Sequence, residues 1–300
     1  MKQSYDPRNA ELLININGEL LPRAEAKISV FDSLVQGGDG CWEGLRVYQG
    51  KIFRLSRHLE RLFHSAKAMG FESIPTEASI RQEIKRTLEA NDMHDGVHIR
   101  LTLSRGEKIT SGMDTRLNQA GPTLIVLAEH KPPVYDKQGL RLVTSSVRRS
   151  PPDCLDPKIH HNNLLPSILA KMEANAAGAD DAIMLDLRGF VAETNATHLF
   201  LVEKGAVKTS RTVACPEGVT RAAILQVCAD NGIPSEVTDL SLAEFHRAEE
   251  VFCTGTMGEL ASVVEIDGRR IGTGEVGTLT KRLSSLYVEL TTNEGESVLE

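Results

Sequence analysis

The chain has 300 residues with a formal net charge of −7, and its 41% hydrophobic and 25% charged residues are those of a globular protein with one large domain or two. The acidic balance, the scattered Lys and Arg residues and the 4% aromatic content argue against nucleic acid or an anionic membrane surface as a partner. Five widely spaced cysteines without a C-x-x-C pair, and the lack of a long apolar run or signal-peptide core, argue against disulfides, a metal site and a membrane span and favour the cytoplasm.

The first half of the chain alternates strand and helix signals. Asn-Gly and Gln-Gly pairs between apolar runs predict tight hairpin turns. Apolar residues at helical spacing then predict two amphipathic helices. The predicted elements are hairpins over 12–21 and 45–54, helices over 55–69 and 77–90, and strands over 97–103 and 123–127. The polar, glycine-containing stretch 104–121 is a candidate mobile loop.

Paired prolines in 131–139 favour an extended linker, so we predict a smaller N-terminal domain over 1–130 and a larger C-terminal domain over 140–300. The elements predicted for the second half are strands over 140–144, 182–186, 198–202 and 250–253, helices over 165–177, 219–230 and 277–290, and a hairpin over 263–271. Sheets with segregated helices in both halves predict an α+β fold.

Three features of the sequence suit an anionic group. Glu217-Gly218-Val219-Thr220-Arg221 precedes an apolar-periodic helix, whose first backbone N–H groups can face a phosphate. Thr254-Gly255-Thr256 ends a buried strand, where glycine permits close approach and hydroxyls can donate. Arg61 is a third candidate. Each has a commoner alternative, an ordinary helix cap for the glycines and a solvated charge for Arg61.

Several motifs, in one order along residues 11–290, resemble the class IV aminotransferases, which are the fold-type IV pyridoxal phosphate enzymes. The nearest pattern is that of the branched-chain amino acid aminotransferases. The resemblance implies a small sheet-plus-helices domain, a larger pseudo-barrel domain and a homodimer. The motifs are Gly38-Asp39-Gly40-Cys41-Trp42-Glu43-Gly44-Leu45-Arg46-Val47-Tyr48, His58-Leu59-Glu60-Arg61, Val191-Ala192-Glu193-Thr194-Asn195-Ala196-Thr197, the two glycine motifs above, and 264–272.

The resemblance also implies roles for individual residues. Glu193 would face the pyridine nitrogen of the cofactor and keep it protonated. Arg61 would bind the cofactor phosphate, together with the backbone of Val219 and Thr220 and the hydroxyl of Thr256. Two residues of the strand 97–103 would lie at the substrate. They are Arg100, near the substrate carboxylate, and His98, which stands where the branched-chain group has an aromatic residue.

The segment 156–163 departs from the family at its lysine, which joins the cofactor and then carries the substrate proton. An alignment without gaps puts His160 at that position, and the nearest lysine is Lys158. In one interpretation Lys158 is the catalytic lysine, because residues two apart in an extended segment share a face and lie about 6.6 Å apart. In the other, Lys158 is a solvated charge and His160 or His161 carries protons near neutral pH.

The predicted function is amino-group transfer between an amino acid, branched-chain or other, and a 2-oxo acid. Two alternatives stay open: a lyase of the aminodeoxychorismate type, and a pyridoxal-phosphate-binding homologue without the usual lysine chemistry. Lys158 and His160 are the candidate catalytic residues.

Overall fold

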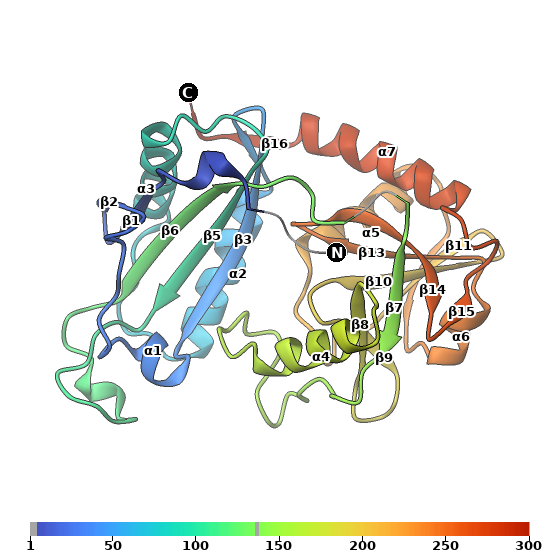
Figure 1. Ribbon diagram of the computed structural model, residues 1–300, viewed down its shortest axis with the longest axis horizontal. Helices are drawn as coiled ribbons and strands as arrows, with labels where there is room; N and C mark the ends of the chain where they lie inside the picture. Colours follow the sequence, from blue (N-terminus) through green and yellow to red (C-terminus); the bar gives the residue numbers. More distant parts are fainter. Residues whose placement is uncertain (1–4, 136–137, 300) are drawn as a thin grey trace. The chain divides into compact units, whose positions relative to one another are not determined.

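The computed structural model describes residues 5–135 and 138–299, which divide into two compact units (Figure 1). The C-terminal unit consists of Pro133–Lys158 and Leu164–Leu290. The N-terminal unit contains the chain up to Pro132, the short segment Ile159–Asn163 and the chain from Thr291 onward. Among the described residues, no helix has the length and apolar character needed to cross a membrane.

The N-terminal unit is built on a seven-stranded sheet with the order β16-β4-β3-β5-β6-β1-β2, in which every pairing is antiparallel. Its strands are β1 (Leu13–Ile16), β2 (Glu19–Pro22), β3 (Gly40–Tyr48), β4 (Lys51–Phe53), β5 (Val97–Ser104), β6 (Thr123–His130) and β16 (Gly295–Ser297). Its helices are α1 (Ser33–Gly37), α2 (Leu55–Ala68), α3 (Glu77–Ala90) and the 3₁₀ turns Pro7–Asn9 and Thr115–Leu117. The predicted hairpins and both amphipathic helices are confirmed.

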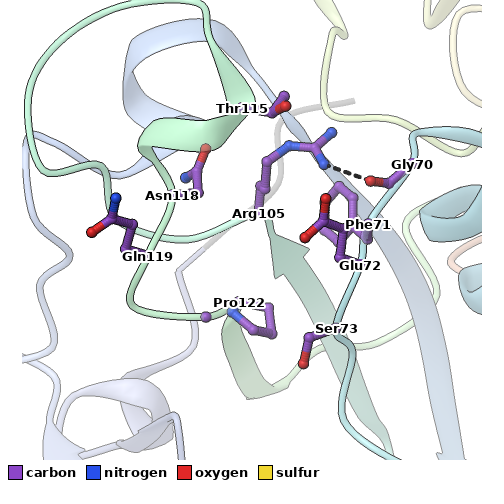
Figure 2. A pocket seen from close by; sticks show the side chains of 10 residues that line it. Gly70, Phe71, Glu72, Ser73, Arg105, Thr115, Asn118, Gln119 and Pro122 are labelled. Carbon is purple, nitrogen blue, oxygen red and sulfur yellow. Dashed lines mark hydrogen bonds between the residues drawn. The ribbon is translucent and has the colours of Figure 1, made fainter.

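The stretch 104–121, predicted as a mobile loop, is placed beside the end of α2. Figure 2 shows a hollow there, which Arg105, Thr115, Asn118 and Gln119 line together with the segment Gly70–Ser73. Arg105 donates to the carbonyls of Met69 and Gly70 at 2.7 and 3.0 Å and pairs with Asp39 at 2.6 Å. These contacts hold the start of the stretch against the N-terminal unit.

Helices α2 and α3 pack on one face of this sheet. Leu59 and Leu62 of α2 and Ile84 of α3 have no exposed surface and share one apolar core with alternate residues of β3 and β5, such as Leu45 and Leu101. Because side chains alternate along a strand, the residues between them point to the opposite face. That opposite face carries Trp42, Arg46, His98 and Arg100, which are neighbours across the β3–β5 pair.

The C-terminal unit contains a nine-stranded sheet with the order β12-β11-β10-β13-β14-β7-β8-β9, to which β15 adds beside β14. Its strands are β7 (Leu140–Thr144), β8 (Asp181–Leu185), β9 (Val191–Thr194), β10 (His198–Glu203), β11 (Ala206–Ser210), β12 (Ser235–Thr238), β13 (Glu250–Gly255), β14 (Glu259–Ile266) and β15 (Arg269–Arg270). The remaining helices are α4 (Leu165–Ala176), α5 (Val219–Asp230), α6 (Leu242–Arg247) and α7 (Thr278–Asn293). The helices predicted over 165–177, 219–230 and 277–290 are confirmed.

Two segments that the sequence assigned to the domain 140–300 belong to the N-terminal unit instead. Strand β16 pairs with β4, and Glu296 accepts hydrogen bonds from the backbone and the hydroxyl of Ser56 at 2.7 Å each. The segment Ile159–Asn163 is tied to β3, because the backbone N–H of Trp42 donates to the carbonyl of His160 at 2.9 Å.

The extended conformation expected at Lys158 is wrong. Pro157 and Lys158 form a turn, which is closed by a hydrogen bond of 2.9 Å from the Lys158 backbone N–H to the side chain of Asp156. The face-sharing argument that related Lys158 to His160 therefore does not apply.

Candidate functional site

The large sheet of the C-terminal unit has one apolar face and one face with polar residues. Leu199 of β10 and Cys253 of β13 are opposite each other and lie in the main core of this unit. Their neighbours His198 and Thr254, also opposite each other, therefore point to the other face. Glu193 points the same way, since it is paired with Met184, which packs against α4 on that face.

Helix α5 begins beside these residues. Its N-cap is Gly218, which provides no side-chain hydrogen bond to the first turn. A Cβ atom at this position would lie 2.4 Å from the ring of His198, so only glycine permits this approach. The first N–H groups of an α-helix have no partner within the helix. The helix therefore presents the backbone N–H groups of Val219 and Thr220 at a point suited to an anion.

Two buried polar atoms near this helix end lack hydrogen-bond partners among the described residues. They are Nε of Arg221, a residue 9% exposed, and Oγ1 of Thr254, which has no exposed surface. The Arg221 side chain is directed by a hydrogen bond of 2.8 Å from Nη2 to the carbonyl of Ser210. Burial lowers the pKa of Arg221, and the nearby Cys215 and Glu217 oppose that shift. Unpaired buried donors cost about 1–3 kcal/mol each, which favours a bound acceptor such as a phosphate.

Glu193 is 4% exposed and forms an ion pair with Arg149, which the sequence analysis did not identify. Arg149 is itself held by hydrogen bonds to the hydroxyl of Ser167 in α4, at 3.1 Å, and to the carbonyl of Ala214, at 3.3 Å. A buried carboxylate that is paired in this way stays ionised. It is therefore suited to face a protonated ring nitrogen.

Lys158 lies near the same helix end, on the turn at 157–158. Its Nζ atom is 3.3 Å from Oε1 of Glu217, the residue that precedes Gly218, and its side chain is 53% exposed. The thiol of Cys215 connects these groups electrostatically. Burial and Glu193 raise its pKa, while Arg149, Arg221 and Lys158 lower it. The expected cofactor residues of this unit therefore lie around one buried point.

A second charged cluster lies within the N-terminal unit around Glu43, which has no exposed surface. Arg61 donates to both of its oxygens at 2.7 Å each, and His58 Nδ1 lies 2.7 Å from Oε2. The Nδ1 atom of His160 lies 3.2 Å from Oε1. Burial would raise the pKa of Glu43, but Arg61, and after it His160, hold this pKa well below its usual range.

The opposite face of this sheet holds the two predicted substrate residues. The guanidinium carbon of Arg100 lies 3.4 Å from the ring centroid of Trp42, and Nη2 donates to Oδ1 of Asn162 at 3.0 Å. Burial lowers the pKa of Arg100 to about 10, and Glu43 opposes this shift. His98 is 7% exposed, and its Nε2 has no partner among the described residues. Burial lowers the pKa of His98 to about 3, with Lys131, Arg46 and Arg100 adding to the shift.

The predicted site residues thus fall into two groups. The C-terminal unit holds Lys158, Glu193, Val219, Thr220 and Thr256, the last directly after β13. The N-terminal unit holds Arg61, His98, Arg100 and His160. Sequence reasoning missed Glu43 and Arg149. The available signal for Glu43 was a carboxylate inside a strand whose other residues are mostly apolar.

Comparison with known proteins agrees with this arrangement. The family model for class IV amino-transferases matches residues 40–266. Branched-chain-amino-acid aminotransferase-like protein 2 of Arabidopsis thaliana is 55% identical over 96% of this chain and 52% of its own length. A putative branched-chain-amino-acid aminotransferase of Methanocaldococcus jannaschii is 37% identical over 96% of this chain and 99% of its own.

Among solved structures, a branched-chain amino acid aminotransferase from the organism abbreviated T.th., complexed with N-(5'-phosphopyridoxyl)-L-glutamate, superposes with a TM-score of 0.89. The two chains are 32% identical, and the match covers 96% of this chain and 99% of that one.

The chain belongs to the class IV aminotransferases, a family of enzymes that use pyridoxal phosphate. The predicted fold class, a two-domain α+β enzyme of fold type IV, is confirmed. The chain spans about half the length of the two Arabidopsis relatives that it matches. The residues of the C-terminal unit fit the cofactor: the N-terminus of α5 and the unpaired Arg221 and Thr254 suit its phosphate, and Glu193 suits its ring nitrogen.

The close approach of Gly218 to His198 leads to a first prediction. Gly218→Ala places a methyl group 2.4 Å from the imidazole, which must displace the first turn of α5. We expect pyridoxal phosphate to bind more weakly by about 1–3 kcal/mol, the usual effect of overpacking. Absorbance titration with the cofactor measures this. The control is Gly37→Ala, since a Cβ atom there would have no neighbour within 4 Å. Equal affinity in both variants would contradict the assignment of this helix end.

The buried His98 leads to a second prediction, for stability in acid. Unfolded histidine takes up a proton near pH 6.5, whereas folded His98 stays neutral down to about pH 3. The unfolded chain thus binds more protons in this window, and stability falls as the pH falls, by up to about 1.4 kcal/mol per pH unit for this residue. Urea unfolding between pH 6.5 and 4.5 should show a smaller pH dependence in His98→Gln. The exposed His94→Gln is the control and should keep the wild-type slope.

Proposed function

We propose that this chain binds pyridoxal phosphate in its C-terminal unit and transfers an amino group between an amino acid and a 2-oxo acid. One observation carries the proposal: the N-terminus of α5, without a side-chain cap, lies near the unpaired Arg221 Nε and Thr254 Oγ1. The buried ion pair of Glu193 and Arg149 faces the same side of the sheet. The names of the relatives support a branched-chain or similar apolar amino acid as donor.

Each residue of this set has a defined part. The backbone N–H groups of Val219 and Thr220, with the hydroxyl of Thr256, bind the phosphate. Glu193 holds a proton on the ring nitrogen, and Arg149 keeps that carboxylate charged and directed. When bound, the cofactor draws electron density from the substrate carbon that loses its proton. Arg61, His98 and Arg100 keep their predicted roles at the phosphate and the substrate as predictions.

Lys158 is the lysine that we assign to the cofactor. Its ammonium group is 3.3 Å from Glu217, directly before the helix that binds the phosphate, and both residues belong to the C-terminal unit. An ion pair this exposed is worth about 0–1 kcal/mol, so Lys158 can exchange Glu217 for another partner. Only Ile159 separates Lys158 from His160 in the chain, and we assign the movement of the substrate proton to His160.

The exposure of Lys158 also favours a second candidate function, a protein that binds the cofactor without attaching it to a lysine. Borohydride separates the two, because it fixes the cofactor covalently to a lysine that it has joined. We expect one labelled peptide, containing Lys158, and loss of the label in Lys158→Ala. Lys281→Ala, which changes an exposed lysine of α7, is the control and should keep the label. Cofactor that is removed completely by dialysis after borohydride would instead support the second candidate.

The reaction itself is tested by a screen of amino donors against 2-oxo acids. We expect new amino acid to form with branched-chain or other apolar donors, and Lys158→Ala to lower kcat by more than about a hundredfold. Release of pyruvate from aminodeoxychorismate, without transfer to any 2-oxo acid, would favour the lyase alternative. Full transaminase rates in Lys158→Ala would exclude our assignment of this lysine. The homodimer stays a prediction, which sedimentation tests.

A further inference from the structure

We propose that Glu43 is a positioning residue that fixes the imidazole of His160 in one tautomer and one orientation, so that its Nε2 atom can accept a proton. The geometric part concerns only the N-terminal unit, because both residues lie in it. The consequence for turnover rests on the proposed function, in which His160 carries the substrate proton. Neither the family match nor the names of the relatives assigns a role to Glu43.

The hydrogen bonds of the Glu43 carboxylate determine its effect. Oε1 accepts from Arg61 Nε at 2.7 Å and lies 3.2 Å from His160 Nδ1. Oε2 accepts from Arg61 Nη2 at 2.7 Å and lies 2.7 Å from His58 Nδ1. The two Arg61 donors form a fork that fixes the plane of the carboxylate. The remaining directions therefore point to the two histidines.

This geometry selects the tautomer of His160. An ionised carboxylate can only accept hydrogen bonds, so Nδ1 of the neighbouring imidazole must carry the hydrogen. In a neutral ring, Nε2 then keeps its lone pair. A carboxylate that orients a histidine in this way is a recurring arrangement in acid–base catalysis. His160 thus has one nitrogen bound to Glu43 and the other available as a base.

Other contacts keep the ring of His160 in place. It stacks on Trp42 with a centroid separation of 4.2 Å and an angle of 26°. Its backbone N–H donates to the hydroxyl of Ser65 at 3.0 Å, and its carbonyl accepts from the backbone of Trp42. The side chain is only 16% exposed. Because backbone and ring are both held, Glu43 controls the one remaining freedom, the choice of tautomer and ring flip.

The charges around His160 favour a neutral ring. Burial lowers the pKa of His160 to about 4, and Arg61 lowers it further, while Glu43 opposes both. The other groups that face this cluster are His58 on α2, Cys41 on β3 and Arg100 on β5, and burial raises the pKa of Cys41 to about 12. The ring is therefore uncharged from about pH 5 upward, as a proton acceptor requires.

Glutamine at position 43 tests the proposal because it replaces one oxygen by an NH₂ group. Either orientation of the amide places N–H groups against an Arg61 donor, and one orientation also donates to Nδ1 of His160. The matched control is Glu60→Gln, which makes the same change on the exposed side of α2, where Glu60 pairs with Arg57.

The first measurement is ¹⁵N NMR of the histidine rings in the holoenzyme, with His160→Asn for assignment. We expect the Nδ1–H tautomer for His160 in the wild type and in Glu60→Gln, and loss of that tautomer in Glu43→Gln. An Nε2–H tautomer in the wild type overturns the proposal, even when Glu43→Gln does not fold. A chain that takes up no cofactor contradicts the proposed function alone, because the tautomer of His160 still decides this inference.

The second measurement is steady-state turnover. We expect Glu43→Gln and His160→Asn each to lower kcat by about a hundredfold, the usual contribution of a general base, with little change in KM for the amino donor. The double variant should be no slower than the single ones, because the two residues act as one unit. Wild-type kcat in a folded Glu43→Gln, or losses that multiply in the double variant, would contradict a positioning role.

Discussion

The negative charge of Glu43, removed completely from water in the middle of β3, is the constraint around which the N-terminal unit is built. A buried carboxylate costs several kcal/mol unless paired ions and hydrogen bonds compensate it. Two compensating groups, His58 and Arg61, are three residues apart and therefore lie on one face of α2. The third comes from the segment Ile159–Asn163. The position of α2 on the sheet and the attachment of this distant segment thus follow from the same charge.

In the C-terminal unit, the two-residue period of the strands has the corresponding role. Alternate residues of β10 and β13 build the main core, so their neighbours are directed to the other face whether or not they are apolar. Polar residues at these positions, such as His198 and Thr254, remain only where something binds them. Gly218 lets α5 begin directly beside them. A phosphate site at this place therefore needs no special element, only a helix end without a cap and two strands with polar residues at alternate positions.

Features determined by local sequence were predictable, and features determined by distant partners were not. The helices over 55–69, 77–90 and 219–230 follow from apolar spacing and match α2, α3 and α5. Glu43 could not be interpreted in the same way, because Arg61 and His160 lie 18 and 117 residues from it. The partner of Glu193 is 44 residues away. Strand β16 likewise depends on contacts of Glu296 to Ser56, 240 residues distant, which no local pattern indicates.

The sequence presented Lys158 and His160 as competitors for one position, and their surroundings differ in a way that gives them different tasks. Pro157 and the hydrogen bond to Asp156 turn the chain, so each residue is paired with its own carboxylate. Lys158 is half exposed beside Glu217, a pairing that water and salt weaken, so its ammonium group can move to a new partner. His160 is held by a buried carboxylate, a stacked ring and its backbone, so it stays in place. A group that must form and break a covalent bond needs the first environment, and a group that must accept a proton from a fixed direction needs the second.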